Sequence, residues 1–285
     1  MENIDELLND ASSASETMYP SASSLGDLSR NPMTEPIPEN SRTILVDHTT
    51  SRFSGAIWYN KVREKTVILA GLGGIGSYVL YLLTRLRVLG VVMYDNDTVS
   101  LVNLAGQLYS KDHIGWSKCS AMSQIAHSFS DYYSITAVES RYSVTSESGP
   151  IMICGFDNME ARKVFYHNWR EYVSHCPSGQ RKHCLFIDGR LASEHLQVLC
   201  IKGDDTFNME RYERDWLFDD EEAEEEICSN KQTSFMANMI ASVMINLFVN
   251  FCANEVDGEE APALERDLPF LTEYDAAMMM FTTEA

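Results

Sequence analysis

Apolar residues along the chain fall into short runs that are separated by polar turns and by segments of helical length. Val67 to Ala70 form a continuous apolar run, as expected of a strand that is buried on both faces. A helix is predicted from about Ser77, and a second apolar run ends at Asp95. Further strands are predicted at 185–190 and 197–201. This succession predicts an α/β fold with parallel strands and crossover helices.

The longest apolar segment runs from Thr233 to Asn254 and predicts a helix with one polar face. Its polar positions recur every four residues, at Asn238, Ser242, Asn246 and Asn250. About 20 apolar residues are long enough to cross a membrane, but a polar stripe is costly in lipid. The segment therefore predicts an amphipathic helix packed on the sheet, with Thr233 or Ser234 as the N-cap and no membrane as a partner.

Between the first strand and the first helix, glycines follow the G-x-G-x-x-G spacing of a nucleotide-binding turn. Gly71 permits a tight turn, Gly73 lets a phosphate approach the backbone, and Gly76 allows close packing of the helix on the strand. Gly74 lies in the same turn. Asp95, about 20 residues further on, is placed to bind a ribose hydroxyl. This pattern fits an NAD- or FAD-dependent oxidoreductase as well as other Rossmann-like enzymes.

The polar residues that follow the second strand narrow this prediction. They stand in a fixed order at the ends of predicted strands: Asp95, Asp97, Asn103, Gln107, Lys118, Asp157 and Asn158. In order and spacing, this set resembles the ThiF/MoeB/HesA family of adenylating proteins, which are related to the ubiquitin-activating enzymes. The resemblance runs from about Ser51 to Asn254. It implies a Rossmann-like three-layer fold, with a parallel nucleotide-binding half followed by a mostly antiparallel substrate half.

The resemblance also implies roles for these residues in binding ATP. Asp95 is expected to bind the ribose, with Asp97 beside it in the nucleotide pocket. Asn103 and Gln107 correspond to residues that contact the phosphates, and Lys118 reaches the phosphates from the start of the next helix.

Two further positions are implied to act in catalysis. Asp157, followed by Asn158, is expected to handle Mg²⁺ and the leaving pyrophosphate. Arg52 is the candidate for an arginine that reaches across a homodimer into the partner's site. The substrate in the family is the C-terminal carboxylate of a small ubiquitin-like, sulfur-carrier or peptide substrate, which becomes an acyl adenylate.

One position departs from the family pattern. Gly106 stands where the family usually carries an arginine that helps to hold the phosphates, so this chain cannot make that charge-assisted hydrogen bond from position 106. Arg162 or Arg190 is a candidate for supplying the missing charge. Asp188 and Arg190 are also candidates for contacting the substrate tail, with a structural turn held by a local ion pair as the alternative.

Transfer of the acyl group to a cysteine thiolate is a second step in many relatives. Cys228 is the candidate nucleophile because it lies in a predicted acidic crossover loop just before the helix start, and Cys184 is a weaker candidate. The neighbouring residues 224–226 are glutamates, which would raise the pKa of the Cys228 thiol, and a cysteine without a covalent role is the alternative.

The seven cysteines contain no C-x-x-C pair, so no structural zinc site is expected. Their odd number and apolar surroundings favour reduced thiols and a cytoplasmic protein. Composition predicts a disordered arm at 1–42 and an acidic tail at 255–285. The resemblance implies an adenylation domain at 43–254, with an acidic crossover loop at 204–232. The net charge of −20 argues against nucleic acid as a partner.

Three functions remain open at this point. The first is ATP-dependent adenylation of a carboxylate on a small protein or peptide by a homodimer. The second is an NAD- or FAD-binding oxidoreductase, which leaves Gln107, Lys118 and Asp157 without a role. The third is a non-catalytic ATP-binding scaffold, which Gly106 suggests.

Overall fold

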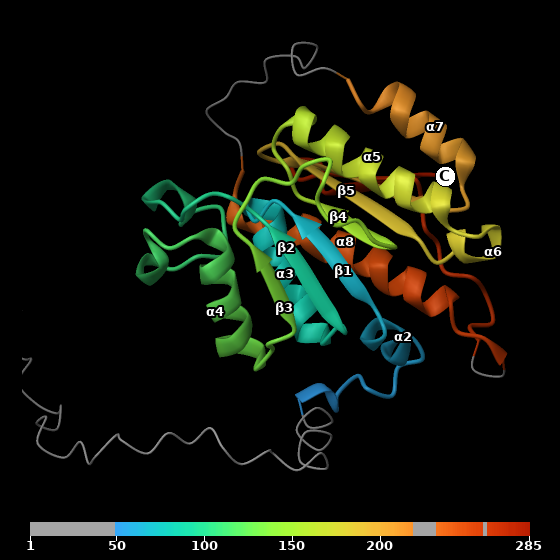
Figure 1. Cartoon of the computed structure of the whole chain (residues 1–285), viewed down its shortest axis with the longest axis horizontal. Coiled ribbons are helices and arrows are strands. Elements are labelled where there is room, and N and C mark those ends of the chain that lie inside the picture. Colours follow the sequence, from blue (N-terminus) through green and yellow to red (C-terminus); the bar gives the residue numbers. More distant parts are fainter. Residues whose placement is uncertain (1–48, 219–231, 259–260) are drawn as a thin grey trace, which may run out of the picture. The chain divides into compact units, whose positions relative to one another are not determined.

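Within the part of the chain that the structure describes, eight strands form one sheet in the order β3-β2-β1-β4-β5-β6-β7-β8 (Figure 1). The structure is a computed structural model that describes residues 49–218, 232–258 and 261–285. The predicted arm at 1–42 and Cys228 lie outside these residues. The strands are β1 (Thr66–Ala70), β2 (Gly90–Tyr94), β3 (Ile135–Val138), β4 (Ile151–Cys154), β5 (Leu185–Leu191), β6 (His195–Lys202), β7 (Leu271–Asp275) and β8 (Met280–Glu284).

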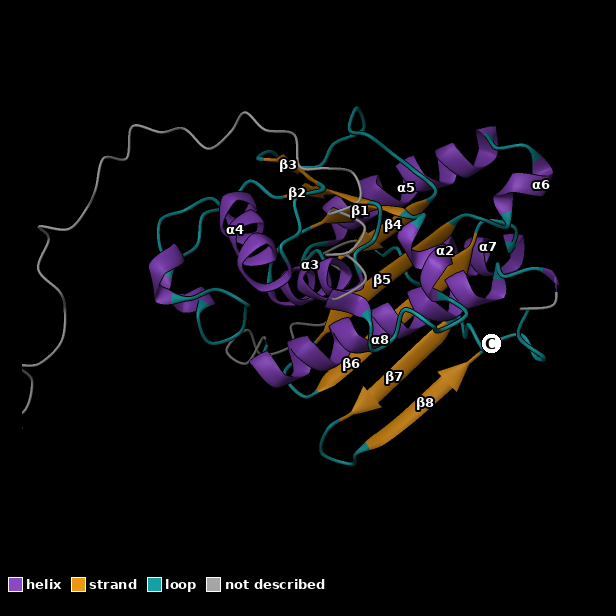
Figure 2. Cartoon of the chain, turned by 90° about the horizontal axis from the view of Figure 1, so that it is seen from below, coloured by secondary structure: helices purple, strands orange, loops and turns teal. Residues whose placement is uncertain are grey.

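The sheet changes from parallel to antiparallel pairing at β5. The strands from β3 to β5 pair in parallel, with β1 between β2 and β4. β5, β6, β7 and β8 pair with one another in antiparallel fashion, and the last two form a hairpin at the edge of the sheet (Figure 2). This arrangement confirms the predicted Rossmann-like α/β fold with a parallel half and a mostly antiparallel half.

Helices cover both faces of this sheet. They are α2 (Tyr59–Arg63), α3 (Gly74–Leu86), α4 (Lys118–Ser130), α5 (Met159–His175), α6 (Ser178–Arg181), α7 (Thr206–Asp215) and α8 (Ser234–Asn254), with short 3₁₀ turns η3 (Leu101–Asn103) and η4 (Lys111–His113). Val67 and Leu69 of β1 join a core with α3, α4 and α8, while Ile68 and Ala70 join a core with α5 and α7. Because both faces of β1 are buried, its sequence is apolar at every one of these positions.

Helix α8 forms where the sequence predicts it, with Thr233 at the N-cap position. It packs against α3, β5 and β6, and its polar positions Asn238, Ser242 and Asn246 are exposed. By length and composition alone α8 could cross a membrane, and 61% of its apolar window is buried inside the protein. The helix thus has the core packing and the polar face that its sequence pattern predicts.

Two boundaries differ from the prediction. The residues expected to be an acidic tail, 255–285, contain β7 and β8, which extend the sheet beyond β6. The first part of the predicted crossover loop, 204–232, contains α7. Both segments are rich in charge, but Met209 and Tyr212 of α7 and Leu271 and Tyr274 of β7 are buried. The buried apolar residues outweigh the acidic composition in these elements.

Candidate active site

The glycine turn joins the carboxyl end of β1 to α3, at the edge of the sheet where the parallel strands end. Gly71 has a φ of +83°, and its N–H donates to the carbonyl of Tyr94 at 3.0 Å. A Cβ atom built on Gly76 would overlap the carbonyl oxygen of Gly71. A Cβ atom on Gly73 would meet no heavy atom within 4 Å. The turn therefore closes tightly and leaves open space at Gly73, the N-cap of α3, and the N-terminus of a helix favours an anion.

Asp95 braces this turn from the end of β2. Its Oδ2 accepts a hydrogen bond from the backbone N–H of Leu72 at 2.7 Å, and its Oδ1 accepts one from the N–H of Asp97 at 2.8 Å. Each carboxylate oxygen keeps a further lone pair with which to accept a ribose hydroxyl. Asp95 thus fixes the position of the glycine turn as well as facing the space beside it.

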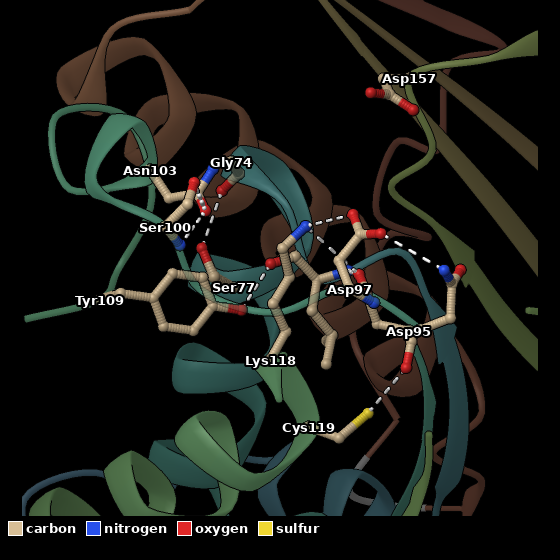
Figure 3. A network of polar contacts seen from close by, with 12 residues as sticks. Gly74, Ser77, Asp95, Asp97, Ser100, Asn103, Tyr109, Lys118, Cys119 and Asp157 are labelled. Atoms are coloured by element: carbon tan, nitrogen blue, oxygen red, sulfur yellow. Dashed lines mark hydrogen bonds and ion pairs between the residues drawn. The ribbon is translucent and has the colours of Figure 1, made fainter. Parts of the chain in front are cut away.

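Lys118 begins α4 and lies beside the two aspartates (Figure 3). Its Nζ is 2.9 Å from Oδ2 of Asp97 and 3.8 Å from Oδ2 of Asp95. The residue is only 6% exposed, so these carboxylates compensate a buried ammonium group. The arrangement brings together three residues that the sequence predicts for the nucleotide site.

The loop between β2 and α4 carries the two predicted amide residues, Asn103 and Gln107, of which only Asn103 has its side-chain oxygen hydrogen-bonded. Oδ1 of Asn103 accepts hydrogen bonds from the N–H and hydroxyl of Ser100, at 2.8 and 2.9 Å, and closes the η3 turn. Oε1 of Gln107 is buried and has no hydrogen-bond partner among the described residues. A buried unpaired carbonyl is unfavourable, so Oε1 of Gln107 is an acceptor to which a ligand or a water molecule can donate.

Two residues that the sequence analysis did not predict hold this loop on the glycine turn. The Tyr109 hydroxyl donates to the carbonyl of Leu72 at 2.7 Å, and the N–H of Leu108 donates to the Ser77 hydroxyl at 3.1 Å. Burial, with the charges of nearby carboxylates, raises the pKa of Tyr109 and keeps its hydroxyl protonated. These contacts join segments that are distant in sequence, so no local pattern identifies them.

Asp157 and Asn158 follow β4 and are both exposed. Asn158 is the N-cap of α5, where its side chain accepts from the N–H of Ala161 at 2.9 Å. Figure 3 shows Asp157 apart from the group that Asp95, Asp97 and Lys118 form. A carboxylate oxygen is a ligand that Mg²⁺ prefers. The described residues contain no group of three or more His, Cys, Asp or Glu side chains that could hold a metal ion.

Arg162 and Arg190 do not supply the missing charge at the nucleotide site, contrary to the prediction. Both pair with Asp188, which is fully buried: Arg162 Nε lies 2.7 Å from Oδ1 and Arg190 Nε 3.0 Å from Oδ2. Tyr212 donates to the same carboxylate at 2.9 Å. Burial raises the pKa of Asp188, but the two guanidinium groups outweigh this effect and lower it. The group is the structural ion pair that the sequence analysis names as the alternative.

This ion-pair group also reaches the active-site edge. Nη2 of Arg162 donates to the carbonyl of Phe156 at 2.7 Å, one residue before Asp157. The buried arginine therefore holds the turn from which Asp157 extends into the site.

The remaining candidates for catalysis, Arg52, Cys228 and Cys184, do not lie with the residues of the glycine turn in the part of the chain that the structure describes. Arg52 is exposed, and its segment, drawn in blue in Figure 1, lies near the amino end of β1, away from the glycine turn. Cys228 lies outside the described residues. Cys184 is buried, and burial together with the nearby Cys176 thiol raises its pKa to about 12, so it is a poor nucleophile. The thiols of Cys119, Cys154, Cys200 and Cys252 are also buried.

The fold and the site define a Rossmann-like protein with a nucleotide-type glycine turn at the carboxyl ends of its parallel strands. The sequence model of the ThiF family matches residues 45–283, and the chain belongs to this family.

Curated relatives match over shorter segments. The ubiquitin-like modifier-activating enzyme 5 of Bombyx mori is 29% identical over 120 residues, which cover 36% of this chain and 30% of that protein. The enzyme of the same name from Culex quinquefasciatus is 34% identical over 89 residues, covering 29% of this chain and 22% of that protein. The matches thus span less than a third of these relatives.

Solved structures match the fold over most of the chain. The structure of PaaA has a TM-score of 0.59 at 12% identity, covering 91% of this chain and 77% of that one. E. coli MccB with MccA-N7isoASN has a TM-score of 0.57 at 15% identity, covering 88% and 80%. E. coli MccB with ATP has a TM-score of 0.51 at 15% identity, covering 87% and 71%. At these identities the likeness shows a shared fold.

Proposed function

We propose that this protein binds Mg²⁺ and ATP at the glycine turn and adenylates the C-terminal carboxylate of a small protein or peptide. The observation that carries the proposal is the position of Asp95 and Lys118 beside the glycine turn that leads into α3, in a chain of the ThiF family. The unpaired carbonyl oxygen of Gln107 supports it, because the ribose hydroxyls and the adenine amino group of ATP are donors that would complete its hydrogen bonding, whereas phosphate oxygens are not.

In this proposal, different side chains bind different parts of ATP. Asp95 accepts the ribose hydroxyls, and the free N–H groups at the start of α3 bind phosphate oxygens. Lys118 leaves or shares its pair with Asp97 to neutralise phosphate charge, and Asp157 would hold the metal ion. The metal supplies charge neutralisation for the triphosphate among these carboxylates.

The reaction is a displacement at the α-phosphate. An oxygen of the substrate carboxylate forms a bond to the α-phosphorus, and the bond from that phosphorus to the oxygen bridging the α- and β-phosphates breaks. The bridging oxygen leaves with the bonding electrons as part of pyrophosphate, and the product is an acyl adenylate. Positioning and charge neutralisation provide most of the catalysis in such a step. No proton transfer is required, because the attacking group is already a carboxylate.

The substrate class follows from the relatives and is part of the proposal. MccB has been solved with the MccA peptide, and the curated relatives are ubiquitin-like modifier-activating enzymes. We extend to this chain a substrate with a free C-terminal carboxylate. The antiparallel half of the sheet, from β5 to β8, is the expected substrate-binding half.

A pyrophosphate-exchange assay with purified full-length chain tests this function. Synthetic peptides with a free C-terminal carboxylate serve as substrates, and the same peptides with a C-terminal amide serve as the matched control. We expect Mg²⁺- and ATP-dependent exchange only with the free acids, and loss of exchange in Asp157→Ala. An Asp215→Ala variant, which alters an exposed surface carboxylate, is expected to retain activity. Exchange that is equal for acids and amides would contradict the proposal.

We also propose a second step, in which the Cys228 thiolate attacks the acyl carbon of the adenylate. A thioester forms, the bond from that carbon to the phosphate oxygen breaks, and AMP leaves with the bonding electrons. A Cys228→Ser variant would then retain pyrophosphate exchange but fail to form a conjugate that is cleaved by thiol reagents. Detection of that conjugate in the serine variant would remove Cys228 from the reaction.

A non-catalytic ATP-binding scaffold is the second candidate function. One structural observation favours the scaffold. Gly106 stands where the family usually has an arginine, and both candidates for replacing that charge, Arg162 and Arg190, pair with Asp188 instead. A scaffold would bind ATP and show no exchange with any free acid. Mass-spectrometric detection of an AMP-linked peptide would exclude it.

A further inference from the structure

Gln232 lies over the phosphate end of the candidate active site, just before the N-cap of α8. A Cβ atom built on Gly74, the first residue of α3, would overlap the carboxamide of Gln232. A Cβ atom built on Gly106 would lie 2.9 Å from Cγ of Gln232 and 3.3 Å from its Nε2. The Gln232 side chain is therefore packed between two glycines that come from different elements.

The Gln232 side chain spans the distance between two elements of the site. Its Cγ lies against Gly106 and its carboxamide ends over Gly74, so it runs from the β2–α4 loop to the N-terminus of α3. A side chain of any size at position 106 would have to displace Gln232, because real Cβ atoms rarely come so close to a neighbour. Gly106 and Gln232 thus form a matched pair: the glycine leaves the space that the glutamine fills.

The position of the carboxamide indicates its ligand. The N-terminus of α3 is the part of the site that favours an anion, and a carboxamide brings two N–H donors to it without adding negative charge. Lys118 begins α4, Asp157 follows β4, and Gln232 precedes α8, so the three residues come from different parts of the chain.

We propose that Gln232 is a phosphate-binding residue of this site and makes the phosphate hydrogen bond that Gly106 cannot make. The inference rests on the proposed function and adds a specificity-determining residue to it. A neutral amide binds phosphate less strongly than a guanidinium group, but it needs no compensating charge when the site is empty.

Titration calorimetry with ATP and Mg²⁺ on the full chain tests this assignment. We expect Gln232→Ala to raise the Kd about five- to tenfold, the loss of roughly one hydrogen bond. Gln232→Glu is expected to raise it further, because a carboxylate over the α3 N-terminus repels the phosphates. Gln180→Ala and Gln180→Glu, on an exposed residue of α6, are the matched controls and should bind as the wild type does.

A double-substitution cycle tests the matched pair itself. Gly106→Ala should weaken ATP binding in the wild type, because its methyl group displaces Gln232. The same substitution should have little further effect in the Gln232→Ala background, where the space is vacant. Thermal unfolding without nucleotide checks that each variant is folded.

The outcomes separate this inference from the proposed function. Absence of ATP binding by the folded wild type would overturn both. Wild-type binding with equal or tighter binding by Gln232→Ala would overturn the inference alone, and tighter binding would mean that Gln232 obstructs the site. Equal effects of Gln232→Ala and Gln232→Glu would also overturn it.

Discussion

Replacing Asp188 by asparagine should destabilise the protein strongly. The carboxylate is fully buried and compensates Arg162 and Arg190, of which Arg162 is itself only 5% exposed. Asparagine has nearly the same shape, so the packing is retained while two guanidinium groups lose their counter-charge. Removal of one partner from a buried ion pair typically costs about 3–5 kcal/mol. We expect a loss of this size in the free energy of unfolding.

Denaturant unfolding at neutral pH measures this loss directly. Asp215→Asn is the matched control, because Asp215 pairs with Arg214 on the surface and its removal should leave the unfolding midpoint unchanged. A loss below about 1 kcal/mol in Asp188→Asn would refute the reasoning, since it would show that the arginines find other compensation. ATP binding should weaken too, because Arg162 holds the turn that carries Asp157.

The pH dependence of the same variant has a definite sign. The pKa of Asp188 is lowered in the folded protein, so its contribution to stability is fully present above the unfolded value of about 4. It is lost as the pH falls through the lower folded value. The difference in stability between wild type and Asp188→Asn should therefore be constant near neutrality and shrink in acid.

Three further predictions concern the pocket and the assembly. Gly76→Ala should lower the melting temperature and abolish ATP binding, because the new methyl group overlaps a turn carbonyl and such overpacking costs about 1–3 kcal/mol or more. Tyr109→Phe should weaken ATP binding and cost about 1 kcal/mol, seen by calorimetry and unfolding, because it removes the hydrogen bond that holds the loop on the glycine turn. If Arg52 acts in a partner's site, an equal mixture of inactive Arg52→Ala and Asp157→Ala chains should regain about a quarter of wild-type exchange activity, since one site in four is intact after random pairing. No recovery after subunit exchange would remove Arg52 from that role.

The sequence predicts the parallel half of this fold because several short sequence patterns there indicate the same structure. The β1 run, the glycine spacing and the position of Asp95 each follow from backbone requirements that are readable over a few residues. α8 is equally readable, because its polar positions recur at helical spacing. β7 is not predicted, because its five residues include two acidic ones and lie in a segment whose overall composition suggests a tail, although Leu271 and Tyr274 are buried.

Contacts between residues that are far apart in the sequence cannot be predicted from local sequence patterns. Nothing in the neighbourhood of Arg162 indicates that it turns toward Asp188 instead of the nucleotide, because the choice depends on how α5 packs on β5. The same holds for Gln232, whose contact with Gly74 and Gly106 appears only when α8 is placed beside α3. The sequence identifies the groups that carry chemistry, and tertiary packing decides which of them face the pocket.

The packing of α3 on α8 has a consequence for synthesis of the chain. α3 carries the glycine turn at its start, and its buried residues Val79, Leu80 and Leu83 need α8 as part of their cover. On the ribosome α3 emerges early, while the strands from β2 to β6 must all be translated before α8 appears. The nascent chain therefore exposes an apolar helix face for most of its elongation, and chaperones that bind such faces would protect it from aggregation.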